Sequence, residues 1–134
     1  MKISFDFDST LSRKDVQYFV IDLITKGHEV WIVTSRCSTE ATLEILGIDN
    51  FQYQRVEKQN KKLFDVAEKV GIPKDRIVFT EHADKIEYLK GKFFTIHVDD
   101  DPDELWAIVQ SGDPCKVVNV EHSDWVYHFN EIIK

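Results

Sequence analysis

The chain has 134 residues, of which 43% are hydrophobic and 12% aromatic. This length and apolar content suit one domain with its own core, and we expect residues 1–134 to form it. The 24 acidic residues outnumber the 17 basic ones and give a formal net charge of −7. A charge of this sign disfavours a broad grip on nucleic-acid phosphates, so we expect no strong nucleic-acid binding.

Cysteine usage and the distribution of charge indicate the compartment. Cys37 and Cys115 allow at most one disulfide, which favours a reducing environment. Asp6 and Asp8 interrupt the amino-terminal segment where a secretion signal would need apolar residues. Charged residues also break every hydrophobic segment before it reaches the ~18 residues that a membrane-spanning helix needs. We therefore expect a cytoplasmic protein with no membrane partner.

The five glycines are too far apart to form either common phosphate-binding loop. Neither G-x-G-x-x-G nor G-x-x-x-x-G-K-[ST] occurs, so dinucleotide-fingerprint and Walker-type sites are excluded. Each glycine instead follows a helix-like segment, where a left-handed residue commonly ends a helix. The glycines thus divide the chain into strand–helix units.

Apolar segments and helical stripes alternate through the first half of the chain. A strand is predicted at Ile3–Phe7, followed by a helix that Ser12 caps. The apolar run Val30–Val33 indicates a strand buried on both faces. Ser38 is placed to cap a helix that ends before Gly47. Phe51–Tyr53 predicts a short strand.

The same alternation continues to the end of the chain. The predicted elements are a helix through Leu63–Val70, a strand at Arg76–Thr80, a short helix over residues 83–90, a strand at Phe93–Val98, a helix that Asp101 and Pro102 open, a strand at Lys116–Val120 and a carboxy-terminal helix with Trp125, Phe129, Ile132 and Ile133. Strands that alternate with helices predict right-handed crossovers. We expect an α/β fold, a three-layer α/β/α sandwich around a mostly parallel, Rossmann-like sheet.

Two acidic residues follow the first predicted strand. Asp6 and Asp8 are two positions apart, so in an extended backbone both would face one site while Phe7 points elsewhere. Carboxylates that face one cleft repel each other unless a cation lies between them. A single carboxylate here would more commonly be a surface or capping residue, so this motif needs support from the rest of the chain.

A second acidic cluster follows the strand predicted at Phe93–Val98. Asp99, Asp100, Asp101 and Asp103 lie at the strand end, where parallel sheets place their ligands. Carboxylate oxygens are the ligands that Mg²⁺ prefers. Asp101 alone is explained as a helix cap, but that role does not account for Asp99 and Asp100.

Polar residues at two further positions are suited to a phosphoryl group. Thr34 ends the second predicted strand, and Ser35 and Arg36 follow it with another hydroxyl and a guanidinium. Thr34 could equally be a helix-entry cap. Lys85 opens the short helix over residues 83–90 and could offset clustered negative charge, although a lone lysine is usually a solvated surface group.

The order of these residues resembles the haloacid dehalogenase (HAD) superfamily of phosphohydrolases. The first motif of that family, an apolar strand followed by D-x-D-x-T, is matched by residues 3–11. A later strand ending in Thr or Ser is matched by Thr34, and the third-motif lysine by Lys85, with Lys90 as its competitor. Paired acids after a strand are matched by Asp99 and Asp100. The sequence departs from the common pattern at Ser9, where many members carry glycine.

The resemblance implies a Mg²⁺-dependent phosphomonoester hydrolase. Asp6 would be the nucleophile that forms an aspartyl-phosphate, and Asp8 the general acid and then the general base. Further implied roles are metal binding by Asp6, Asp8, Asp99 and Asp100, with Asp103 as an alternative to Asp100; phosphoryl orientation by Thr34 and Lys85; and substrate binding by Thr10, Ser35 and Arg36.

The spacing of the motifs leaves no room for a cap domain. Residues between Asp8 and Thr34, and between Thr34 and Lys85, are used by the expected helices and strands. The chain is therefore similar to capless members, and residues 61–102 resemble the 5′-nucleotidase-like branch. The implied substrate is a phosphorylated small molecule or nucleotide, or the phosphorylated end of a macromolecule. Whether the chain forms an oligomer stays open.

Other classes remain as alternatives. A response-regulator receiver also combines acids, a threonine and a lysine on a small α/β sheet, although its phosphoacceptor should end a middle strand. A PIN-type metal nuclease would cluster acids without needing D-x-D-x-T, and a binding protein could use the same fold without turnover. Cysteine phosphatases are excluded because neither cysteine has an arginine six residues later. No paired Cys/His zinc motif is present.

Overall fold

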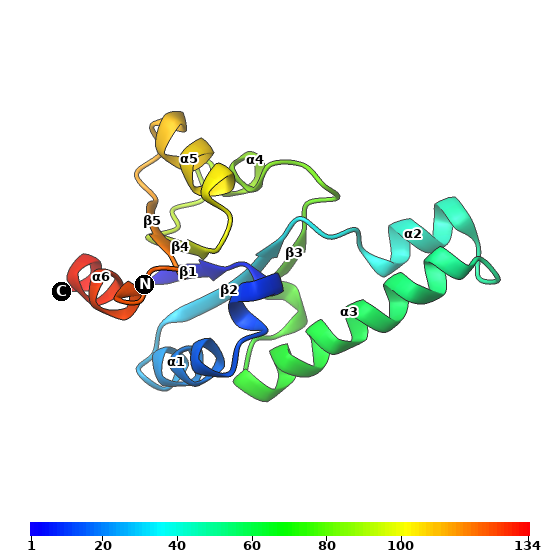
Figure 1. The fold of residues 1–134 in the computed structure, drawn as a ribbon, viewed down its shortest axis with the longest axis horizontal. Helices are drawn as coiled ribbons and strands as arrows, with labels where there is room; N and C mark the ends of the chain where they lie inside the picture. Colours follow the sequence, from blue (N-terminus) through cyan, green and yellow to red (C-terminus); the bar gives the residue numbers. More distant parts are fainter.

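Five parallel strands form one sheet in the order β3-β2-β1-β4-β5 (Figure 1). This computed structural model describes residues 1–134. Each neighbouring pair in the sheet is parallel. The strands are β1 (Lys2–Phe5), β2 (Glu29–Thr34), β3 (Ile77–Phe79), β4 (Ile96–Asp99) and β5 (Lys116–Asn119). All five predicted strands in these regions are confirmed, with shifts of a few residues at their ends.

Helices cover both faces of this sheet. They are α1 (Lys14–Thr25), α2 (Thr39–Leu46), α3 (Phe51–Val70), α4 (Lys85–Leu89), α5 (Pro102–Ser111) and α6 (Trp125–Ile133). The helices α1, α3 and α6 pack on one face, and α4 and α5 on the other (Figure 1). The predicted three-layer sandwich is therefore confirmed, without a cap domain. No helix combines the length and apolar character needed to cross a membrane.

Side-chain alternation along the strands separates an apolar face from a polar line. Ile3 and Phe5 of β1 point into the larger core, beneath α1, α3 and α6. Ser4, between them, points to the other face and meets His97 of β4, and both are fully buried. Asp6 and Asp99 follow in the same alternation, so this polar line leads to the carboxyl end of the sheet.

The segment around residue 51 differs from its prediction. Phe51–Tyr53 is not a strand but the first turn of α3, which runs without a break to Val70. The side chain of Asn50 accepts hydrogen bonds from the N–H groups of Gln52 and Tyr53 and so caps the helix. The strand propensity of two aromatic residues is weaker than this cap and the helical burial pattern that follows. Gly71 ends the helix with a left-handed φ of 98°, as its position predicted.

Two smaller predictions are also wrong. Ser12 does not cap α1, because its hydroxyl accepts from the N–H of Ser9 and the helix begins one residue later, after Arg13. Phe93 does not begin β4. It has a left-handed φ of 65° and is largely exposed, so the strand starts only at Ile96.

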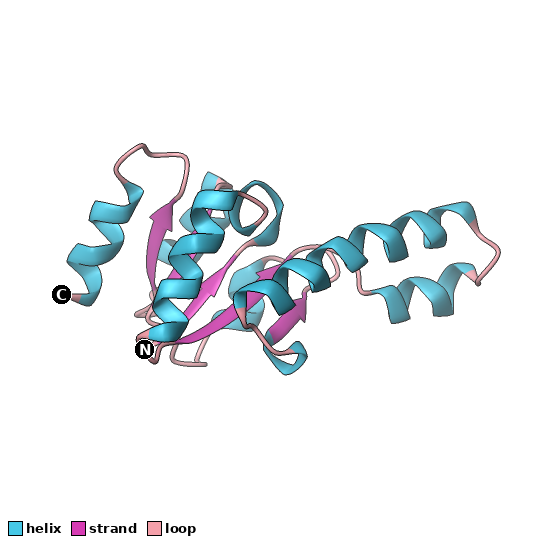
Figure 2. Cartoon of the chain, turned by 90° about the horizontal axis from the view of Figure 1, so that it is seen from below, coloured by secondary structure: helices cyan, strands magenta, loops and turns pink.

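Helix α2 and the amino-terminal half of α3 form an antiparallel hairpin. Figure 2 shows this hairpin extending away from the sheet at the end of the molecule opposite α6. Ser38 caps α2 by accepting from the N–H of Ala41, which confirms its predicted role. The carboxy-terminal half of α3 returns to the core through Leu63, Ala67 and Val70. One helix thus joins the projecting hairpin to the body of the fold.

Candidate active site

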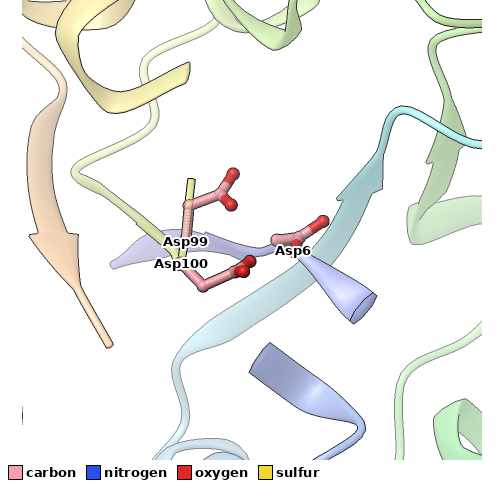
Figure 3. A group of neighbouring side chains, drawn as sticks. All are labelled: Asp6, Asp99 and Asp100. Carbon is pink, nitrogen blue, oxygen red and sulfur yellow. The ribbon is translucent and has the colours of Figure 1, made fainter. Parts of the chain in front are cut away.

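Three carboxylates meet at the carboxyl end of the sheet. We call Asp6, Asp99 and Asp100 the acid trio, since one oxygen from each lies within 4.8 Å of the others (Figure 3). Asp6 directly follows β1, Asp99 ends β4, and these two strands are neighbours in the sheet. The carboxyl ends of adjacent parallel strands share one edge, which is why acids from distant motifs converge here.

Lys85 joins two members of the acid trio. Its Nζ donates to Oδ1 of Asp6 at 2.9 Å and to Oδ2 of Asp99 at 2.6 Å, and its side chain is only 3% exposed. The backbone N–H of Lys85 donates to the carboxylate of Glu104, which fixes the start of α4. Lys90 is exposed at the other end of α4. Of the two candidate lysines, the structure therefore brings Lys85 into the site.

A buried histidine supports the same carboxylate. Nε2 of His97 lies 2.8 Å from Oδ2 of Asp99, and Nδ1 lies 2.7 Å from the Ser4 hydroxyl. Burial lowers the pKa of His97 against the opposing effect of Asp99, which favours a neutral ring. A neutral ring that donates from Nε2 to Asp99 accepts at Nδ1 from Ser4. Ser4 and His97 therefore orient Asp99 from beneath the site.

The two buried carboxyl groups, Asp6 and Asp99, have pKa values that are shifted in opposite directions. Burial, together with the charge of Asp99, raises the pKa of Asp6 to about 8, although Lys85 opposes this. Burial also disfavours ionisation of Asp99, but hydrogen bonds from His97 and Lys85 outweigh it and hold the pKa of Asp99 below its ordinary value. Burial likewise opposes the charge on Lys85, and both carboxylates overcome it and raise the pKa of Lys85. These opposed pKa shifts make Asp99 the stronger acid of the two carboxyl groups and Asp6 the weaker one.

Asp8 does not face the acid trio with its side chain, contrary to the prediction. The strand ends at Phe5, so the extended backbone on which that prediction depended stops before Asp8. The Asp8 carboxylate instead accepts two hydrogen bonds from Arg36, at 2.9 Å from Nε and 2.6 Å from Nη2. Nη1 of Arg36 donates to the Gln59 carbonyl and to the Asn60 side chain of α3. Arg36, predicted as a substrate-binding residue, thus fixes Asp8 against α3.

The loop after β1 turns sharply just after the two aspartates of the first motif. Ser9 has a left-handed φ of 58°, a conformation that glycine adopts more easily than other residues. Thr10 is fully buried, and its hydroxyl donates to Oδ1 of Asp100 at 3.3 Å. Thr10 therefore supports one member of the acid trio rather than standing free for a substrate.

Thr34 and Ser35 lie at the carboxyl end of β2, next to β1. Thr34 is buried, and its hydroxyl accepts from the N–H of Arg36 at 3.3 Å. Ser35 is half-buried, and its carbonyl accepts from the N–H of His82 in the β3–α4 loop. These contacts tie the β2 end to its neighbours at the same edge of the sheet as the acid trio.

The remaining acids of the second cluster have local roles. Asp101 caps α5 by accepting from the N–H of Asp103 at 2.9 Å. Asp103 is exposed in the first turn of that helix and is not part of the acid trio. Of the two predicted partners for Asp99 in metal binding, Asp100 is therefore the one that lies beside it.

The acid trio suits a hard divalent cation. Carboxylate oxygens from three residues converge, and this group contains no sulfur or nitrogen ligand. The Thr10 hydroxyl donates to Oδ1 of Asp100, and Oδ2 of Asp100 accepts no hydrogen bond from the protein. The donor set therefore fits a hard divalent cation, with Lys85 hydrogen-bonded to two of its members.

Sequence reasoning missed the residues that support the site from within the fold. His97 lies two positions before Asp99 on one strand, so alternation places both on the same face. That spacing was a usable signal. Asn60 accepts from Arg36 and donates to the Cys37 carbonyl, but its role depends on the path of α3 and has no local signature.

No family model, curated protein or solved structure that was compared with this chain matches it. The assignment of a function therefore depends on the residues of the site and on their geometry.

Proposed function

We propose that the chain is a divalent-metal-dependent phosphomonoester hydrolase that acts through an aspartyl-phosphate on Asp6, as its resemblance to the HAD superfamily implies. The observation that carries this proposal is the contact of Lys85 with both Asp6 and Asp99 in a buried cluster beside Asp100. A buried lysine held between carboxylates supplies positive charge where phosphoryl oxygens would lie. Perturbed, buried ionisable groups at a strand end are typical of functional sites.

The proposed reaction has two steps at phosphorus. A carboxylate oxygen of Asp6 forms a bond to phosphorus while the ester P–O bond breaks, and Asp8 gives its proton to the departing alkoxide. Asp8 then removes a proton from water, and the resulting hydroxide attacks the phosphorus of the aspartyl-phosphate. The acyl phosphate P–O bond breaks, which releases inorganic phosphate and restores Asp6.

The other residues of the site would bind the metal ion, balance charge and position the reacting groups. Asp6, Asp99 and Asp100, with the Asp8 carbonyl, would hold Mg²⁺, whose charge lowers the repulsion between Asp6 and a phosphate dianion. Lys85 balances the charge of the phosphoryl group, and Arg36 fixes the Asp8 carboxylate on the side where the alcohol leaves. Thr34 and Ser35 offer hydroxyl groups from the end of the adjacent strand.

Strand order weighs against the receiver alternative. Receivers have the order 2-1-3-4-5, whereas this sheet has β1 in the centre of the order β3-β2-β1-β4-β5. The central strand here carries Asp6, and the end of β3 carries Thr80 rather than an acid. Receivers carry the phosphoacceptor at the end of their third strand, and β3 of this chain has no acid at that position.

The test is hydrolysis of p-nitrophenyl phosphate with Mg²⁺ and with excess EDTA. Wild-type protein should turn over in Mg²⁺ and stop in EDTA. Asp6→Asn should abolish turnover and keep the folded circular-dichroism spectrum, because the amide is nearly isosteric but cannot act as the nucleophile. Asp49→Asn, an exposed change on the hairpin, is the matched control and should leave the rate unchanged. Wild-type-like turnover by Asp6→Asn would refute the aspartyl-phosphate route.

The same samples separate the other classes. A metal nuclease would cleave an unphosphorylated oligonucleotide at internal positions, whereas the proposed enzyme would leave it intact. A non-catalytic module would bind Mg²⁺ without turning over any phosphomonoester.

A further inference from the structure

A groove borders Asp8 on the side of α3. Its walls are Phe7, Asp8 and Ser12 from the segment after β1, Arg36 from the segment after β2, and Gln59, Lys62 and the apolar Val66 from α3. We call this the Asp8 groove; its volume is about 630 Å³. No member of the acid trio lines it. Asp8, two residues after Asp6 in the same loop, connects the acid trio with the groove along the chain.

Under the proposed function, Asp8 is the general acid that protonates the leaving group. A general acid must lie within hydrogen-bond reach of the oxygen that it protonates. The phosphoryl group would lie at Asp6 and Lys85, so the ester oxygen would lie toward Asp8. The alcohol portion of the substrate then extends beyond Asp8, into the groove.

Positive charge lines the groove in a protein of net charge −7. Arg36 is engaged with Asp8, so these two charges offset each other. Lys62 forms no ion pair, whereas its neighbour Lys61 is bound to Asp65 at 2.9 Å. Lys62 is therefore an uncompensated cation in the lining of the groove.

The rest of the lining favours hydroxyl groups over a nucleobase. Phe7 is 4% exposed, and its ring faces the Arg36 guanidinium at 5.0 Å, so it offers no free face for stacking. Bases in protein sites are generally stacked on aromatic side chains. Gln59 and Ser12 instead place an amide and a hydroxyl on the groove walls. Such groups hydrogen-bond to the hydroxyls of a polyol or sugar.

We propose that the Asp8 groove binds the alcohol portion of the substrate, and that this portion is a small polyol or sugar carrying a second phosphate that Lys62 binds. This inference rests on the proposed function, because the direction of the leaving group follows from the role of Asp8. The second phosphate is not hydrolysed in the same event; it contributes binding, which lowers KM and discriminates between substrates.

The test compares two matched pairs of compounds in Mg²⁺. One pair is fructose monophosphate and fructose bisphosphate, and the other is adenosine monophosphate and adenosine bisphosphate. For wild-type protein, kcat/KM for fructose bisphosphate should exceed that for the monophosphate by about tenfold through KM, the ratio expected for one charge-assisted contact. Lys62→Gln should reduce this ratio to about one. Lys61→Gln, which removes an adjacent charge outside the groove, should preserve it.

Three results would overturn the inference. Equal KM values for fructose monophosphate and bisphosphate in the wild-type protein would remove the second anion site. A ratio that survives in Lys62→Gln would assign the discrimination to another residue. A larger ratio for the adenosine pair would show that the groove accepts a nucleotide rather than a polyol.

A binding measurement keeps the inference testable apart from turnover. Calorimetry with Asp6→Asn and the two fructose phosphates should show about tenfold tighter binding of the bisphosphate, and Lys62→Gln in that background should remove the difference. Absence of p-nitrophenyl phosphate hydrolysis by wild-type protein refutes the proposed function and the direction of the leaving group, while the calorimetric comparison still tests the anion site at Lys62. Hydrolysis of that compound without any preference for the bisphosphate refutes this inference alone.

Discussion

Nε2 of His97 lies 2.8 Å from Oδ2 of Asp99, the same oxygen that accepts from Lys85. Asp99 therefore receives two donors on one oxygen, while its other oxygen accepts the N–H of Asp101. Because Asp99 is fully buried, the donors decide whether its charge is tolerated. His97 belongs to the charge balance of the site although it was not among the predicted site residues.

Replacing His97 by leucine should destabilise the fold. The change leaves Asp99 with one donor fewer and leaves the buried Ser4 hydroxyl without its partner, which should cost about 2 kcal/mol or more. Urea unfolding at pH 7 measures the loss. His128→Leu is the matched control, because His128 makes a similar contact with Asp124 on the surface. A loss of equal size in both variants would contradict a specific role for His97.

The raised pKa of Asp6 makes stability depend on pH. The folded protein holds a proton on Asp6 up to about pH 8, whereas the unfolded chain releases it near 3.8. The folded state thus binds more protons in this window, so the free energy of unfolding falls as pH rises through it. The lowered pKa of Asp99 has the opposite effect on the free energy of unfolding, but only at pH values below its ordinary pKa of 3.8.

Thermal unfolding in EDTA tests this dependence. Asp6→Asn removes the titrating group, so its Tm should exceed that of the wild-type protein by about 10 °C or more at pH 8. The difference should shrink toward pH 5, because each pH unit in this window changes the free energy of unfolding by about 1.4 kcal/mol. Asp8→Asn, at an exposed carboxylate, should follow the wild-type profile. A parallel decline for wild type and Asp6→Asn would show that Asp6 does not carry the proton.

Local signals were sufficient to predict the layers of the fold. Apolar runs such as Val30–Val33 mark buried strands, and residues such as Ser38 and Gly71 mark helix ends through backbone chemistry that acts within a few residues. The start of α3 was misjudged because Phe51–Tyr53 has strand-like composition, while the deciding cap, Asn50, lies just outside that run.

The site was predictable where it follows strand ends and unpredictable where it depends on loops. Asp99 and Asp100 terminate β4, so their convergence with Asp6 follows from parallel topology. The direction of Asp8 depends on the loop after β1 and on its contacts with Arg36, which no periodicity reveals. Lys62 reaches the groove only through the path of α3, a tertiary feature.

Lys85 and Lys90 should differ sharply in function. Lys85→Ala removes the buried cation between Asp6 and Asp99 and should lower kcat for p-nitrophenyl phosphate by about 100-fold or more. Lys90→Ala, at the exposed end of α4, should change kcat by less than about twofold. Steady-state kinetics in saturating Mg²⁺ compares them. A large loss of kcat in Lys90→Ala, together with an unchanged kcat in Lys85→Ala, would reverse the assignment.

Asp100 and Asp103 should differ in metal binding. Asp100 lies in the acid trio, so Asp100→Asn should weaken the binding of Mg²⁺ by about tenfold. Asp103→Asn changes an exposed residue in the first turn of α5 and should leave metal binding unchanged. Calorimetric titration with MgCl₂ measures both. Equal Mg²⁺ affinities for the two variants would place the ion outside the acid trio.

The Arg36–Asp8 pair has a close counterpart away from the site, which allows a controlled test of its role. Arg36 contacts Asp8 at 2.9 and 2.6 Å, and Arg13 contacts Asp15 at 3.0 and 2.7 Å through the same guanidinium atoms. Both pairs are partly exposed, so each ion pair by itself should contribute less than about 1 kcal/mol of stability, and the other hydrogen bonds of Arg36 and Arg13 add to the cost of removing either side chain.

Only one of these pairs holds a group with a proposed role in catalysis. Arg36→Ala frees the Asp8 carboxylate from its fixed position and should lower kcat for p-nitrophenyl phosphate by about 10-fold to 100-fold, because hydrolysis of the aspartyl-phosphate needs the Asp8 base within reach of the attacking water. Arg13→Ala should leave kcat within about twofold of wild type. Kinetics and urea unfolding on the same samples separate a positioning effect from a loss of folded protein. If both variants lose activity in proportion to their stability, Arg36 contributes only to folding, and Asp8 is positioned by the backbone of its loop.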